Sequence, residues 1–327
     1  MSIGFYVETK GISMDANKKG VILCLLSAFC YALGPIIGKL LFNIGMPWQV
    51  VAPVRGMIPG ILLLIYAAIF AKEVFKIKRE HLKWFILNGV SFGFISVCNY
   101  CSIYYINASV ATVLLYTLPV FTVILSRFML KEKFTTVKII ATTLVFSGCV
   151  CIINLTNLDA IAAQPDLYIL GIPSVVFGII IGLMSGILSA LYTIFTRKLN
   201  GYYEGWTVNS WCYFMGFPVF FCVGIKHIVT FDWAPNYALF LLIMALIGLA
   251  AYSLYAICMH FIDAGKASLI VTLDPVMSIT MSVLILHEAI SPLQFTGIIL
   301  VAAGILFMEL GQPYIDKFKN RKKELSS

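Results

Sequence analysis

Asp274 has the clearest chemical potential in the sequence, because it is the one acidic residue in the apolar stretch 267–286. An ionised carboxylate in a bilayer core costs at least about 2.5–3.5 kcal/mol, so burial favours the neutral acid. Asp274 is therefore a candidate proton carrier or amine contact. Pro275 follows it and cannot donate a hydrogen bond to the carbonyl of Val271, which leaves the backbone locally open. The alternative interpretation is that Asp274 binds neighbouring helices and only pins this break.

Arg55 is a second charge inside an apolar stretch. Its guanidinium could bind the carboxylate of a ligand. It could equally extend to the outer lipid headgroups or pair with a group inside a helix bundle, and we favour such a structural role. Lys39 lies nearer to the end of its own stretch, where its side chain can reach the membrane surface.

Polar and aromatic side chains within the apolar stretches form the rest of the candidate site. They are Tyr31, Asn99, Tyr100, Tyr104, Tyr116, Tyr252 and Tyr255. A tyrosine hydroxyl in lipid needs a hydrogen-bond partner, so these residues should face protein or water. Rings for stacking and hydroxyls for orientation suit an amphipathic metabolite. The alternative is that several of them only form interfacial belts or bonds between helices.

The composition indicates that these residues belong to a membrane protein. Hydrophobic residues make up 61% of the 327 residues and charged residues only 12%, whereas a soluble domain carries about 25% charged residues. These values exclude a soluble enzyme, a disordered chain and a nucleic-acid binder, although the formal net charge is +8. The nine cysteines all lie in apolar stretches, and Cys98-x-x-Cys101 lacks a second pair. We therefore predict neither disulfides nor a metal site.

Ten apolar stretches are long enough, at about 20 residues each, to cross a bilayer as helices. They are residues 20–42, 48–71, 84–105, 109–130, 136–155, 172–195, 206–225, 238–261, 267–286 and 291–310. With the N-terminus in the cytoplasm, every Lys and Arg except Lys39, Arg55 and Lys226 falls on the inner side, as the positive-inside rule requires. The sequence predicts an all-α polytopic protein of the cell membrane, with both termini in the cytoplasm.

An internal repeat divides these ten helices into two halves. Residues 105–152 align without gaps on residues 261–308. The matched pairs include Pro119 with Pro275, Glu132 with Glu288, Gly148 with Gly304 and, at nearly the same spacing, Ser27 with Ser185, Lys39 with Arg197 and Trp48 with Trp206. Because each half holds five helices, the second half is inverted in the membrane. Such inverted repeats are typical of transporters with a site near the midplane.

The repeat also defines the expected organisation of the chain. We predict a cytoplasmic segment at 1–19, a first five-helix repeat at 20–155, an external linker at 156–171, a second repeat at 172–310 and a basic tail at 311–327. Pro119 and Pro275 are the predicted helix breaks of the two repeats. Gly178, Gly182 and Gly186 allow helices to approach closely, within the chain or, less favoured, in a dimer. Glu132 and Glu288 are expected to form hydrogen bonds at helix ends.

The order of short motifs resembles the EamA-type members of the drug/metabolite transporter superfamily. The motifs are Tyr105-Ile106-Asn107-Ala108, Leu118-Pro119-Val120 and Leu130-Lys131-Glu132-Lys133 in the first half, and Ala190-Leu191-Tyr192-Thr193, Leu273-Asp274-Pro275-Val276 and Leu286-His287-Glu288 in the second. The resemblance implies alternating access around a central cavity, lined mainly by the first, third, fourth, sixth, eighth and ninth helices. The sequence departs from the family pattern at Tyr31-Ala32, where Trp-Gly is common in the family.

These observations favour a secondary transporter of a small amphipathic metabolite, such as an amino acid, that works by export and is coupled to protons. Asp274 is the expected coupling residue, and Asn99, Tyr100, Tyr116 and Tyr252 are the expected walls. A non-transporting scaffold or sensor is the alternative. The sequence has neither a phosphate-binding loop nor a His-Glu-x-x-His spacing, so we expect no enzyme and no cofactor. Lipid and substrate are the expected partners of a monomer or homodimer.

Overall fold

A computed structural model shows how the apolar stretches fold. It describes residues 16–43, 46–106, 111, 114–132, 135–153, 168–169, 171–231, 233, 235–274, 276–277, 280–281, 291–293 and 295–308. Within these ranges six helices are long and apolar enough to cross a membrane. The protein is an all-α polytopic membrane protein, as the sequence predicts.

The helices follow the order of the predicted spans. They are α1 (Ala16–Asn43), α2 (Trp48–Ile69), α3 (Leu82–Tyr105), α5 (Leu118–Met129), α6 (Thr136–Ile153), α7 (Ser174–Leu199), α8 (Gly205–Thr230), α9 (Pro235–Cys258), α10 (Ala264–Val271) and a last helix at Phe295–Met308. Two short 3-10 helices, Lys72–Phe75 and Arg79–His81, connect α2 to α3. Successive helices cross in opposite directions. We call the end where α1 begins and α9 ends the proximal end, and the opposite one the distal end.

Two of the predicted spans, 109–130 and 267–286, are not continuous helices, and each contains a proline at which the sequence predicts a break. In the first repeat a turn at Tyr116 and Thr117 precedes α5, and Pro119 lies in the first turn of that helix. In the second repeat α10 ends at Val271 and a turn follows. A proline is tolerated in the first turn of a helix, where its missing N–H is not needed. Pro275, the counterpart of Pro119, lies outside the described residues.

A short hairpin is the second departure from the predicted spans. Strand β1 (Tyr168–Ile169) pairs antiparallel with β2 (Ile172–Pro173) directly before α7. Gly171 in the turn has a φ of 78°, which glycine adopts without strain. The sixth membrane helix consequently begins at Ser174 rather than at residue 172.

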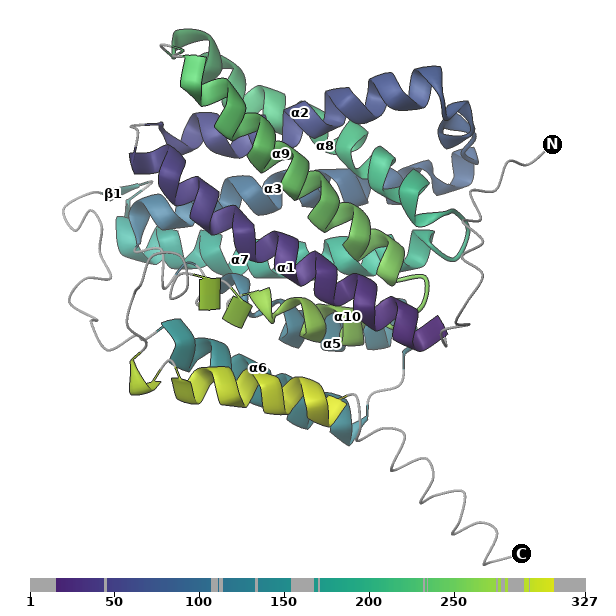
Figure 1. Cartoon of the computed structure of the whole chain (residues 1–327), viewed down its shortest axis with the longest axis vertical. Coiled ribbons are helices and arrows are strands. Elements are labelled where there is room, and N and C mark those ends of the chain that lie inside the picture. Colours follow the sequence, from purple (N-terminus) through teal and green to yellow (C-terminus); the bar gives the residue numbers. More distant parts are fainter. Residues whose placement is uncertain are drawn as a thin grey trace, which may run out of the picture.

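The helix packing is symmetric between the two repeats. α1 packs along α9 (Figure 1), and α3 packs along α7. These contacts are equivalent, because α1 and α7 open the two repeats and α3 and α9 are their third helices. Similarly, α7 contacts α5 and α1 contacts α10, while α2 packs against its own counterpart α8. The two halves therefore form an interlocked inverted pair.

Glycine contacts show this symmetry at the level of single residues. A Cβ added to Gly20 of α1 would lie 2.7 Å from the Cβ of Phe261, and one added to Gly178 of α7 would lie 3.1 Å from the Cβ of Tyr105. Both positions need glycine, because these distances leave little or no room for a methyl group. Tyr105 and Phe261 are equivalent in the repeat, so each half meets the other through the same contact.

The predicted glycine motif of α7 serves packing within the chain. A Cβ added to Gly182 would lie 2.6 Å from Cδ1 of Leu114, and one added to Gly186 would lie 2.7 Å from the carbonyl oxygen of Leu114. Leu114 precedes α5 in the fourth membrane helix. The preferred interpretation of these glycines is confirmed, and the face that they form is already covered by the chain itself.

Candidate functional site

The two helix breaks meet at one hydrogen bond. The hydroxyl of Tyr116, in the turn before α5, donates to Oδ1 of Asp274 at 2.6 Å. Both side chains are only partly buried. The two interrupted helices thus bring together two residues that the sequence places in the candidate site.

Threonines satisfy the carbonyl groups at these breaks. Thr117 Oγ1 donates to the carbonyl of Leu114 at 2.6 Å. Thr272 Oγ1 donates to the carbonyl of Leu269, also at 2.6 Å. Polar backbone groups inside a membrane must be satisfied by the protein, so these bonds stabilise a non-helical turn at each break. Local bonds of this type make the interruptions a feature of the fold.

The surroundings of Asp274 and Tyr116 are apolar. Tyr116 and Leu273 pack against a cluster that comprises Val137, Ala141, Val145, Cys149, Leu269, Val301 and Met308. In the part of the chain that the structure describes, no cation pairs with Asp274. Tyr116 can donate to an ionised Asp274 and accept from a neutral one. The pair therefore has the chemistry needed to bind and release a proton.

Arg55 lies in a second group of polar side chains, between the two repeats. The hydroxyls of Tyr31, Tyr100, Tyr213 and Tyr252 are close enough to interact electrostatically with its guanidinium. These tyrosines belong to α1, α3, α8 and α9, so Arg55 points into the bundle rather than to the lipid headgroups. The position supports an interior role and argues against simple extension to the membrane surface.

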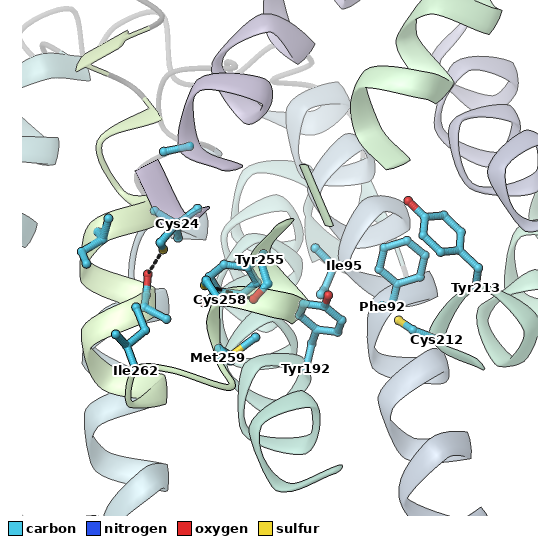
Figure 2. Packing of buried hydrophobic residues seen from close by; sticks show 14 of the residues in the cluster. Cys24, Phe92, Ile95, Tyr192, Cys212, Tyr213, Tyr255, Cys258, Met259 and Ile262 are labelled. Carbon is cyan, nitrogen blue, oxygen red and sulfur yellow. Dashed lines mark hydrogen bonds between the residues drawn. The ribbon is translucent and has the colours of Figure 1, made fainter. Parts of the chain in front are cut away.

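Aromatic rings pack beside this guanidinium. Tyr31 and Tyr252 meet edge to face with 5.0 Å between ring centroids. Phe92 lies 4.6 Å from Tyr252 and 4.8 Å from Tyr213, and Figure 2 shows it between Tyr213 and Tyr192. We call Tyr31, Phe92, Tyr192, Tyr213 and Tyr252 the aromatic cluster. It combines a large apolar surface with several hydroxyl groups.

Two buried polar atoms, one on α3 and one on α7, lack hydrogen-bond partners among the described residues. Among the described residues, the hydroxyl of Tyr192 and Oδ1 of Asn99 are buried without a hydrogen bond. Tyr192 is 5.7 Å from Tyr252, measured between ring centroids. Buried polar groups are nearly always satisfied by protein or water, so unsatisfied ones need an explanation. Here they mark hydrogen-bonding capacity that the chain does not itself use.

Charged residues close the proximal end of the bundle. Lys138, at the start of α6, contacts Glu132 at 3.1 Å and Asp263 at 3.4 Å. Asp263 also lies 4.0 Å from Arg197 at the end of α7, and Arg197 donates to the carbonyl of Met259. We call Glu132, Lys138, Arg197 and Asp263 the proximal ion network. It connects the loops of both repeats.

The position of Glu132 follows from how α5 ends. Lys131 has a φ of 57°, in the left-handed region, and the N–H of Glu132 donates to the carbonyl of Ser126. The turn directs Oε1 of Glu132 to the N–H of Ala264, at 3.0 Å, where α10 begins. An acidic group at a helix N-terminus stabilises the helix, because its negative charge interacts with the positive end of the helix dipole. The expected helix-end hydrogen bond is confirmed for Glu132, and Glu288 lies outside the described residues.

Six of the predicted site residues therefore fall into two groups. Asp274 and Tyr116 connect the broken helices, while Arg55, Tyr31, Tyr100 and Tyr252 lie between the repeats. The side chains of Tyr104 and Lys39 lie outside the described part of the chain. Sequence reasoning did not select three members of the aromatic cluster, Phe92, Tyr192 and Tyr213. The available signal was the repeat, which pairs Arg55 with Tyr213 when the match of Trp48 with Trp206 is continued along the helix.

The remaining potential ligands do not form a metal site. All nine cysteines are free thiols. Within the described residues, no group of three or more His, Cys, Asp or Glu side chains could hold a metal ion.

Comparisons with known proteins agree with this architecture. Residues 18–154 and 176–310 each match the EamA-like transporter family. An uncharacterized transporter of Clostridium kluyveri is 27% identical, over 88% of this chain and 92% of that protein. The uncharacterized transporter YetK of Bacillus subtilis is 23% identical, over 92% of this chain and 90% of that protein.

A solved crystal structure has the same fold. It superposes with a TM-score of 0.72 at 14% identity and covers 91% of this chain and 99% of that one. The expected two-repeat architecture and the resemblance found in the sequence are both confirmed. The chain belongs to the EamA-like transporter family and is a membrane transporter.

Proposed function

We propose that the protein is a secondary transporter of a small amphipathic metabolite, an amino acid or a related compound, that alternates access to a site between its two repeats. The hydrogen bond between Tyr116 and Asp274 carries the proposal. It joins equivalent breaks of the two halves, so movement of one half against the other must change it. A carboxyl group at such a joint can couple its protonation to that movement.

The closed proximal end supports alternating access. The proximal ion network connects the two repeats at the proximal end. From the repeat we infer two equivalent residues at the distal end: Lys39, the counterpart of Arg197, and Glu288, the counterpart of Glu132. In the proposed cycle the proximal contacts break while the equivalent distal contacts form. The substrate site is thereby exposed first to one side and then to the other.

The distribution of positive charge gives the proposed orientation. The described residues of the proximal end include Lys18 and Lys19 at the start of α1, Lys76 and Arg79 between α2 and α3, and Arg197 and Lys198 at the end of α7, so this end faces the cytoplasm in this proposal. We propose export as the physiological direction, since the family resemblance favours it. Protons moving inward would then drive the substrate outward.

Flux in reconstituted vesicles tests the proposal. Full-length protein in proteoliposomes is screened by counterflow with amino acids, amines, nucleobases and sugars, and the best substrate is measured with and without a pH gradient. We expect flux that responds to the gradient. Asp274→Asn should remove this response while its thermal unfolding curve stays close to that of the wild type.

Two results would contradict the proposal in different ways. Absence of counterflow for every compound would favour the scaffold alternative. An unchanged pH response in Asp274→Asn would remove Asp274 from the coupling mechanism and leave transport itself intact.

A further inference from the structure

We infer that Arg55 binds a carboxylate of the transported compound, and that the site therefore selects small amphipathic carboxylic acids over amines of the same shape. The inference rests on the proposed function, because it names the substrate class for the same interior site. It is carried by three observations on Arg55: its position, its lack of a counter-ion and its relation to the repeat.

Arg55 lies in the interior, between the two repeats. Its neighbours come from four helices of both repeats. Arg55, Tyr31, Tyr100 and Tyr252 are each only partly buried by the rest of the chain. A ligand that enters between the repeats meets the guanidinium and the tyrosine hydroxyls together.

Among the described residues the guanidinium has no counter-ion. In the part of the chain that the structure describes, Arg55 forms no ion pair and no hydrogen bond, and its polar neighbours are neutral phenols. Charges inside membrane proteins almost always pair with other groups or mark a substrate pathway. A carboxylate matches the planar fork of a guanidinium with two parallel hydrogen bonds. An anionic ligand would therefore complete this site, whereas a cationic amine would be repelled.

The repeat shows that the residues around Arg55 differ from those at the equivalent place in the other half. Continuing the two matches of the repeat along their helices pairs Arg55 with Tyr213 and Phe92 with Gly248. In one half the ring of Phe92 packs 4.8 Å from that of Tyr213. In the other half Gly248 faces Arg55, and a Cβ added there would lie 3.4 Å from Nε. A cation with a glycine beside it thus replaces an aromatic pair.

The two sides of this asymmetric site fit the two parts of an amphipathic acid. The Arg55 side offers a cation, and a Cβ added to Gly34 of α1 would also approach it, at 3.9 Å from Nη2. The opposite side offers the rings of Phe92 and Tyr252 and the unsatisfied hydroxyl of Tyr192. A carboxylate bound to Arg55 would place an attached apolar group against these rings.

Three probes of the same shape test the charge preference. L-Phenylalanine carries a carboxylate and an amine, 3-phenylpropionate carries only the carboxylate, and phenethylamine carries only the amine. The thermal unfolding midpoint of the purified full-length protein is measured with each, because a ligand of the folded state must raise it. We expect both carboxylates to raise the midpoint and phenethylamine to leave it unchanged.

Variants at Arg55 separate binding from a structural role. Arg55→Gln should lose the response to both carboxylates, and Arg55→Lys should bind them about tenfold or more weakly, since lysine keeps the charge but not the bidentate fork. A purely structural cation would be rescued by lysine. Arg127→Gln, which removes an exposed arginine at the end of α5, is the matched control and should respond like the wild type.

Gly248→Val keeps the test decisive if Arg55→Gln does not fold. It retains the charge but fills the space beside Nε, and it should also lose the response to carboxylates. The inference is overturned if phenethylamine binds as well as 3-phenylpropionate, if neither carboxylate binds, or if Arg55→Gln or Gly248→Val binds them like the wild type.

Uptake of the labelled probes into proteoliposomes distinguishes the two proposals. Uptake of phenethylamine alone contradicts the carboxylate site, and carboxylate binding without any uptake contradicts transport.

Discussion

Tyr116 and Asp274 depend on each other because the phenol hydroxyl is the hydrogen-bond donor that faces the carboxylate. Tyr116→Phe removes this bond and keeps the ring in its apolar surroundings. Hydrogen bonds inside membranes contribute about 0.6–1.7 kcal/mol, so we expect only a small loss of thermal stability. The pH at which flux is half-maximal should nevertheless shift, because the hydrogen bond that stabilises the ionised Asp274 is lost.

Measurement of flux against pH in proteoliposomes checks this prediction. The sign follows from the bond: without the donor the carboxyl group is easier to protonate, so the profile should move to higher pH. Tyr66→Phe, at a tyrosine that is 47% exposed, is the control. A profile that coincides with that of the wild type would show that the hydrogen bond has no part in coupling.

Among single elements, the interrupted fourth membrane helix has the clearest functional consequence. Pro119→Ala restores an N–H in the first turn of α5 and allows the helix to continue through Tyr116 and Thr117. We expect turnover to fall by an amount equivalent to about 1–3 kcal/mol, as is typical of coupling energies between sites. The unfolding midpoint should be unchanged or slightly higher, since alanine favours a continuous helix.

A proline in an uninterrupted helix provides the control for this element. Pro59 lies inside α2, which continues through it. Pro59→Ala should leave turnover close to that of the wild type. Equal effects of the two substitutions would mean that proline content, and not the break, determines transport.

The interlocked glycines predict matched losses of stability. Gly20→Ala and Gly178→Ala each force a methyl group against a side chain of the other repeat, so each should destabilise the protein by about 1–3 kcal/mol. Thermal unfolding in detergent measures both. Gly60→Ala is the control, because its Cβ would lie 3.5 Å from the nearest atom, an ordinary contact. Loss of stability in only one of the two variants would contradict equivalent packing.

For the whole molecule, the proposed cycle requires that the proximal ion network holds the proximal end closed. Lys138→Met leaves Glu132 and Asp263 without their shared cation, and Lys138 is only 6% exposed. Breaking one partner of a buried pair costs about 3–5 kcal/mol, so the closed proximal state should lose population. We expect faster hydrogen exchange around residues 259–264.

Hydrogen exchange monitored by mass spectrometry measures this change. Lys76→Met is the control, because Lys76 pairs with Glu73 in an exposed contact 2.9 Å long that contributes about 1 kcal/mol or less. Exchange at residues 259–264 that is as slow in Lys138→Met as in Lys76→Met would contradict a gating role.

The sequence was sufficient to predict the fold, but not the way in which the candidate site residues are arranged. Hydrophobic length and the repeat were sufficient for the fold class and the order of helices, because both depend on chain composition. Asp274, Tyr116, Arg55 and Tyr252 were selected by residue type. The sequence did not predict that these residues form two separate groups, because the grouping depends on which face each helix presents to the other repeat. The exact span limits and the β1–β2 hairpin depend on local turns that hydrophobic patterns do not contain.

The exchange of an aromatic pair for Arg55 and Gly248 has a consequence for how such a chain could arise from a duplicated gene. Two identical copies of the first half would carry two guanidinium groups in one membrane interior, and each would face a Phe92 ring instead of a glycine. Two identical copies of the second half would carry no such cation at all. A single anion site therefore requires that both halves have diverged and remain joined, and an ancestral homodimer of either half could not have had it.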